Sequence, residues 1–269
     1  MNPLERALIE KAGNDSGFEH TLQQDADTVT LASARHRTRA VVEQSLSGYT
    51  VRFVSAISAL LPELGRSFQQ RSAEGFVAVT DAELARLLRR AANLSQALPN
   101  QAVLDYEAAM RERLTELPAG LGGTEVERMV RQRVGQERFR AALFDYWGGA
   151  CAVTGVDLPE VLRASHAKPW AACDSDAERL DIYNGYLLTA NLDALFDRFL
   201  ISFDDTGRLL ASPRLSQKDV ETLSIHPAMH LRWITDAHRS YLAFHRTRFE
   251  QLAAASLSIS AAHGGKLEP

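Results

Sequence analysis

The stretch NGYLLTANLDALFDRFLISFDDTGRLLASP, residues 184–213, decides the fold of the C-terminal part of this chain. It opens with Asn184-Gly185, a pair typical of turns, and continues as a short apolar run that indicates a strand. A helical segment follows. Two short runs then flank Asp205–Gly207, which predicts a hairpin with its turn there. The predicted order is therefore strand, helix and hairpin.

Three chemically interesting features lie in or near this stretch. His166 stands in LRASHAKPW, ahead of the predicted strand, and Asn184 begins the strand. Asp193 and Asp197 fall four residues apart on one face of the predicted helix, where like charges repel by a few tenths of a kcal/mol and invite a cation. Each feature also has an ordinary explanation: a structural or solvated histidine, a turn, and a solvated helix face.

The order of these features favours a functional site. A histidine on the first segment is followed by a loop, a strand that begins at an asparagine, and a helix that carries acidic residues. Strand, loop, strand and helix, with a histidine, an asparagine and a helix-borne metal ligand, is the plan of a ββα-metal nuclease site.

Residues from about 134 to 250 resemble the HNH endonucleases, in particular the branch found in bacterial restriction-type proteins. The resemblance rests on GQERFRAALFDYWGGACAVTGV, SHAKPW, ERLDIYNGYLLTANLDALFDRFLISF and, more loosely, SYLAFHRTRFE. It implies an HNH nuclease domain that acts on DNA, in a chain that would belong to a restriction system.

The resemblance also implies roles for single residues. His166 matches the general base, and Asn184 matches the residue that pins the loop between the strands and so orients that histidine. Asp193 stands where the family has a metal-binding histidine, and Asp197 is a second position that faces the metal. Ser165 stands where many relatives place an Asp or His ligand. The ligand set is therefore left open. A catalytically decayed HNH scaffold that binds DNA is one alternative, and a nuclease toxin is another.

Hydrolysis of a phosphodiester needs a base for the attacking water and positive charge near the phosphate oxygens. Neutral His166 suits the first need, and a divalent cation suits the second. Carboxylate ligands favour Mg²⁺ or Mn²⁺. Phosphate contacts are predicted for Lys168, Arg179 and Arg198, with surface charge as the alternative for each. His245 is interpreted as a histidine on a helix surface, with support of the site or a phosphate contact as the alternative.

The N-terminal part has a different pattern of residue types. Short runs rich in Val, Thr and aromatic residues between residues 18 and 55 indicate strands, as does GFVAVT at 75–80. Helices are predicted over 2–12, 56–70, 81–96 and 101–117. The chain is thus expected to be α+β, with a β-meander and helices first, then a long helix interrupted near Gly135, then the nuclease domain.

The best boundary between domains is LPAGLGGTE, residues 117–125, because it is rich in turn formers. We therefore predict a recognition domain over 1–117 and a nuclease domain over 124–253 that ends in a helix from Asp236 to about Leu252. Residues 254–269 are predicted to be a flexible tail.

The recognition domain carries a cluster of three arginines, Arg35, Arg37 and Arg39, between two predicted strands. The cluster could contact a DNA backbone, and a solvated turn is the alternative. By analogy only, a module that reads modified bases is one version of this hypothesis.

Composition bounds the remaining choices. The 269 residues carry a net charge of −4, which argues against a general nucleic-acid coat but not against an enzyme with local basic patches. The two cysteines form no CxxC pair, and no apolar run reaches the roughly 18 residues of a membrane span. We expect a cytoplasmic protein whose partner is DNA and not a membrane; a homodimer is left open.

Overall fold

The computed structural model of the protein describes residues 1–269 except 26, 46–47, 74, 99–100, 116–123 and 264–269. The chain divides into two compact units, Met1–Leu104 and Asp105–Pro269. This division falls within helix α4, Gln101–Thr115. The predicted break at 117–125 lies almost wholly outside the described residues, so the proposed domain limits stay predictions.

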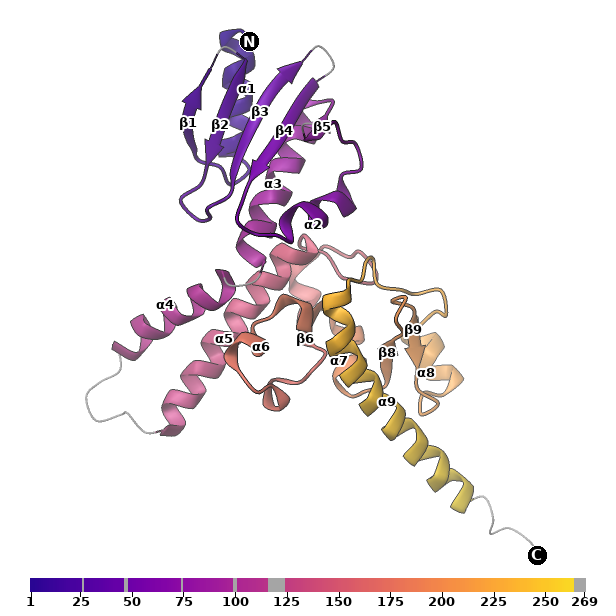
Figure 1. The fold of residues 1–269 in the computed structure, drawn as a ribbon. Helices are drawn as coiled ribbons and strands as arrows, with labels where there is room; N and C mark the ends of the chain where they lie inside the picture. Colours follow the sequence, from indigo (N-terminus) through magenta and orange to yellow (C-terminus); the bar gives the residue numbers. More distant parts are fainter. Residues whose placement is uncertain (26, 46–47, 74, 99–100, 116–123, 264–269) are drawn as a thin grey trace, which may run out of the picture. The chain divides into compact units, whose positions relative to one another are not determined.

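An antiparallel sheet of five strands, in the order β1-β2-β3-β4-β5, is the centre of the first unit (Figure 1). Its strands are β1 His20–Gln24, β2 Thr28–Ala32, β3 Arg39–Ser45, β4 Gly48–Val54 and β5 Phe76–Ala78. The register places Val29, Val42 and Val51 side by side, and all three are fully buried. Residues that alternate with these valines face the other side of the sheet, which makes one face apolar and one face open.

Three helices accompany this sheet: α1 Pro3–Asn14, α2 Leu60–Ser67 and α3 Asp81–Ala97. Helices α1 and α3 lie against the same face of the sheet (Figure 1). Helix α3 presents a fully buried row that includes Leu84, Leu87, Leu88 and Ala91. The predicted mixture of a meander and helices is therefore confirmed.

The second unit begins with α4 and continues with α5, Thr124–Trp147, which is a single α-helix. The predicted interruption near Gly135 is wrong. Gly135 lies within the helix, and its lack of a side chain allows close packing: a Cβ there would lie 2.2 Å from Cη2 of Trp170. A glycine that lowers helix propensity here marks an approach between two segments and not a break.

A two-stranded hairpin and a helix follow. Strand β6, Leu162–His166, pairs antiparallel with β7, Gly185–Thr189, and α7, Ala190–Asp197, begins directly after β7. The long connection between the strands contains three short helical turns of three or four residues each: η2 Trp170–Ala172, α6 Asp176–Arg179 and η3 Ile182–Asn184. Another short turn, η1 Pro159–Val161, precedes β6. This is the predicted ββα arrangement.

The rest of the unit covers this motif. The hairpin of β8 Ile201–Phe203 and β9 Leu209–Ala211 turns through Gly207 at a φ of +85°, as predicted. Then come α8, Gln217–Thr222, and α9, Asp236–His263. The backbone of α9 stays helical beyond Leu252, the predicted end, and through much of the predicted tail. Within the described residues, no helix combines the length and apolar character needed to cross a membrane.

Candidate active site

His166 ends strand β6 opposite Gly185, with its imidazole held at one nitrogen. Its Nε2 lies 2.9 Å from the backbone carbonyl oxygen of Arg179. A carbonyl oxygen can only accept a hydrogen bond, so Nε2 carries the proton and Nδ1 keeps its lone pair. Burial lowers the pKa of His166 from 6.5 to about 4. The ring is therefore neutral near pH 7, with a fixed tautomer and one basic nitrogen.

Aromatic rings fix the plane of this imidazole. Phe139 of α5 stacks on His166 with ring centroids 3.8 Å apart and an interplanar angle of 13°. Trp170 meets it edge-on, at 5.8 Å and 90°. The backbone at Gly185 makes room for this stack, because a Cβ there would lie 2.4 Å from Cζ of Phe139.

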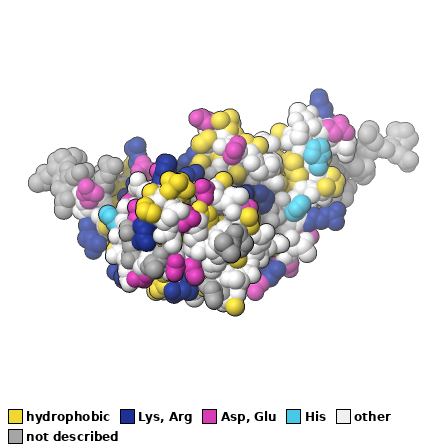
Figure 2. Space-filling view, turned by 90° about the horizontal axis from the view of Figure 1, so that it is seen from above, with side chains coloured by type: hydrophobic (Ala, Val, Ile, Leu, Met, Phe, Trp, Pro, Cys, Tyr) yellow, Lys and Arg dark blue, Asp and Glu magenta, His cyan; other side chains and the backbone are white. Residues whose placement is uncertain are grey.

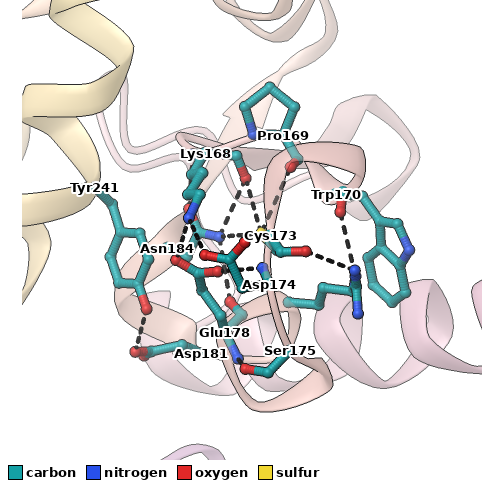
Figure 3. A network of polar contacts seen from close by, with 11 residues as sticks. Lys168, Pro169, Trp170, Cys173, Asp174, Ser175, Glu178, Asp181, Asn184 and Tyr241 are labelled. Carbon is teal, nitrogen blue, oxygen red and sulfur yellow. Dashed lines mark hydrogen bonds and ion pairs between the residues drawn. The ribbon is translucent and has the colours of Figure 1, made fainter.

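The fully buried side chain of Asn184 ties together the loop between β6 and β7 (Figure 3). Its Oδ1 accepts from the backbone N–H of Lys168 at 2.7 Å. Its Nδ2 donates to the carbonyl oxygens of Lys168 and Glu178, both at 3.2 Å. The second carbonyl precedes Arg179, whose own carbonyl oxygen accepts the hydrogen bond from Nε2 of His166. Asn184 thus supports the loop that orients the histidine.

Two cations of this loop, Lys168 and Arg179, are already engaged within it. The Lys168 ammonium lies 2.7 Å from Glu178 and 3.4 Å from Asp174, and Glu178 raises the lysine's pKa. The Arg179 guanidinium donates to the carbonyl oxygen of Cys173 at 2.6 Å and pairs with Asp176 at 2.9 Å. A phosphate would have to compete with these partners, so the DNA contacts expected from both residues stay predictions.

Ser165 and Asp193 form a second contact between the hairpin and α7. The buried hydroxyl of Ser165 donates to Oδ1 of Asp193 at 2.5 Å. Ser165 therefore fixes the orientation of one carboxylate.

Asp197 shares a cavity of about 450 Å³ with His166. The other residues that line the cavity are Gln136, Phe139, Arg140, Ala164, Pro169, Trp170, Phe199 and His245. Although the side chain of Asp197 is exposed overall, partial desolvation of its carboxyl group and the negative charge of Asp193 together raise its pKa to about 6, while Arg198 opposes the shift. Arg198 itself is exposed at the end of α7.

The prediction that His245 of α9 lies on a helix surface is wrong. It is only 1% exposed and lines the same cavity. Its Nε2 lies 3.0 Å from the carbonyl oxygen of Phe196 and its Nδ1 lies 2.9 Å from Oγ of Ser202. The ring also stacks on Phe196, with centroids 3.7 Å apart. Packing of α9 over β8 buries the face of α9 that carries this histidine.

The two aspartates fit a divalent cation. They lie one turn apart on α7, and their mutual repulsion would be relieved by an ion that both carboxylates ligate. Among the described residues, no group of three or more His, Cys, Asp or Glu side chains is close enough to hold a metal. Two carboxylates are nevertheless a normal protein contribution for Mg²⁺, which keeps several waters and binds substrate phosphates as well.

A family model described as HNH endonuclease matches residues 151–204. The match spans β6, β7 and α7 and includes His166, Asn184 and both aspartates. This segment is an HNH endonuclease domain. The HNH domain indicates a nuclease that acts on DNA, and such domains commonly use a divalent metal. No curated protein matches the chain at a significant level.

Part of the cavity comes from outside the matched HNH segment. Phe139 and Gln136 come from α5 before it, and His245 comes from α9 after it. Sequence reasoning missed Gln136 and Phe139, along with Phe199 inside the segment, and offered support of the site by His245 only as an alternative, because the pattern of all four is that of ordinary apolar or surface positions. The one available signal was Gly135, four residues before Phe139, because glycine is unfavourable in the interior of a helix.

The predicted arginine cluster lies in the first unit. Arg35, Arg37 and Arg39 are exposed and line a hollow of about 580 Å³. Glu19 lies 3.8 Å from Arg35. In the view of Figure 2, basic and acidic side chains are interspersed over the surface. Any electrostatic attraction to DNA would therefore come from local groups of arginines and not from the overall charge of −4.

Proposed function

We propose that the protein is a metal-dependent DNA endonuclease in which His166 is the general base. The observation that carries this proposal is the state of the His166 ring. Nε2 donates its hydrogen bond to the Arg179 carbonyl and so carries the ring proton, burial keeps the ring neutral, and the ring lines the same cavity as Asp197, which leaves Nδ1 to act as the base.

In the proposed reaction, a water oxygen attacks the phosphorus of the scissile phosphodiester. The water gives a proton to Nδ1 of His166, and the bond from phosphorus to the leaving oxygen breaks. Asn184 acts as a positioning residue, since it holds the loop that supplies the Arg179 carbonyl. Phe139 limits tilting of the imidazole, which keeps Nδ1 directed to one place.

Asp193 and Asp197 would hold the divalent cation, for which Mg²⁺ or Mn²⁺ suits the oxygen donors. When bound, such an ion supplies positive charge for the phosphate oxygens and for the leaving oxygen. Ser165 would keep the Asp193 carboxylate in position for this ion.

We further propose that the first unit directs the HNH domain to its target, as in a restriction-type enzyme, with modified DNA as one candidate target. The exposed arginines at 35, 37 and 39 support this role because they would contact phosphates, and Arg198 would do so near the site. Such contacts predict binding that weakens steeply as salt increases.

Digestion of supercoiled plasmid tests the activity. Unmodified plasmid and plasmid with modified bases are incubated with Mg²⁺, Mn²⁺ or EDTA, and nicked and linear products are measured. We expect products with either metal and none with EDTA. A protein that binds DNA but produces no nicks under all these conditions would instead be a DNA-binding protein with a decayed HNH scaffold.

A further inference from the structure

Phe199, directly after the end of α7, has an unusual backbone conformation. Its φ is +54°, in the left-handed region that residues other than glycine rarely adopt. The chain needs this conformation to end the helix: the N–H of Phe199 donates to Phe196, and the N–H of Leu200 donates to Leu195 at 2.8 Å. Glycine would make these bonds without strain, so the backbone does not explain the phenylalanine.

Ser224 provides a comparison within the same unit. It is the other non-glycine residue with a positive φ among the described residues, also +54°, and it follows the end of α8. Its side chain is small, polar and exposed. Left-handed helix ends in this protein therefore do not require an aromatic ring.

Phe199 lies in the wall of the cavity of about 450 Å³ that His166 and Asp197 also line. It is only partly buried, and its ring contacts the ring of His245, with centroids 4.7 Å apart. Phe139 and Trp170 are further aromatic residues in the wall, and the cavity volume of about 450 Å³ lies within the range of about 300–1,000 Å³ typical of small-ligand pockets. His166 and Asp197 supply the polar part of the wall, whereas the rings offer an apolar surface.

We propose that the Phe199 ring is a binding surface for a nucleobase next to the scissile phosphate. This inference rests on the proposed endonuclease function and adds a contact that selects DNA bearing an accessible base. Nucleobases stack on aromatic side chains irrespective of their sequence. A base within a duplex is covered by its neighbours, so the base that contacts Phe199 has to leave the stack or come from an unpaired strand.

The test measures binding of the full-length protein to two fluorescent single-stranded oligonucleotides in EDTA, which prevents cleavage. One carries normal bases, and the other has the same number of phosphates but abasic sugars. We expect Phe199→Gly and Phe199→Ala to weaken binding of the normal strand on the order of tenfold and to leave the abasic strand unchanged. Phe199→Tyr, which keeps a ring, should bind within about twofold of the wild type.

Thermal melting separates the ring from the backbone. Phe199→Gly should melt at a higher temperature than Phe199→Ala, since both lack the ring and glycine alone relieves the positive φ. Ser224→Gly is the matched control, because it relieves the same φ and should bind both strands like the wild type.

Equal affinity of Phe199→Gly and wild type for the normal strand would overturn the proposal, and so would equal losses on both strands. Because these measurements need no cleavage, they also separate this inference from the proposed function. A wild-type protein that never nicks plasmid but shows the base-dependent loss in Phe199→Gly would refute the nuclease and support the base contact.

Discussion

Replacement of His166 by alanine, combined with a pH profile, tests the proposed base most directly. General-base assistance is typically worth about 10²–10⁴-fold in rate, so His166→Ala should lower the nicking rate by about that factor at pH 7. Its DNA affinity should stay close to that of the wild type, because the imidazole would contact the water and not anchor the strand. His230→Ala, at an exposed histidine of the same unit, is the matched control.

The pH profile follows from the pKa of His166. With an ordinary pKa of about 6.5, the neutral fraction of a histidine would fall about 25-fold between pH 7 and pH 5. With the pKa of about 4 that burial gives His166, the neutral fraction falls by only about 10% over this range. Loss of the base by protonation should therefore begin only near pH 4, well below the pH of about 6 that the sequence alone predicts.

Asp197 gives a second, distinguishable acid limb. Its pKa of about 6 means that the carboxylate needed for the cation is lost as pH falls through this value. Because the cation competes with the proton, more Mg²⁺ should shift this limb to lower pH. Nicking rates are measured from pH 4.5 to 8 at low and high Mg²⁺. A limb centred near pH 6.5 that does not move with Mg²⁺ would refute the neutral, buried base.

Three further predictions follow from the site. Asp193→Asn and Asp197→Asn should each raise the Mg²⁺ concentration needed for half-maximal nicking, and an unchanged requirement would remove that residue from the ligand set. Gly135→Ala, which normally stabilises a helix by about 1 kcal/mol, should here lower both the melting temperature and the nicking rate, because its Cβ would displace Trp170. Asn184→Ala should destabilise the protein by about 1–3 kcal/mol in a urea titration, since buried loop groups lose their partner, with loss of nicking at temperatures where the variant is still folded. Wild-type stability in either of the last two variants would contradict the packing described.

The ββα motif could be predicted because its signals are local. A strand, a helix and a hairpin are each encoded by residues within about 30 positions, and side-chain periodicity indicates each of them. The meander of the first unit could be predicted for the same reason, since its strands are neighbours in sequence and in the sheet. Helix ends were less predictable: apolar and small residues after Leu252 favour neither a stop nor a continuation.

The chemical types at the site and their order can be predicted from the amino-acid sequence: His166, then Asn184, then two aspartates on one helix face. The protonation and orientation of those groups depend on how the chain folds. A pKa depends on burial and on charges from other segments, and the pKa of His166 is set by packing under α5 and by a carbonyl thirteen residues away. In the same way, His245 lies in the cavity because α9 folds back over β8, a contact that no local pattern in the sequence encodes.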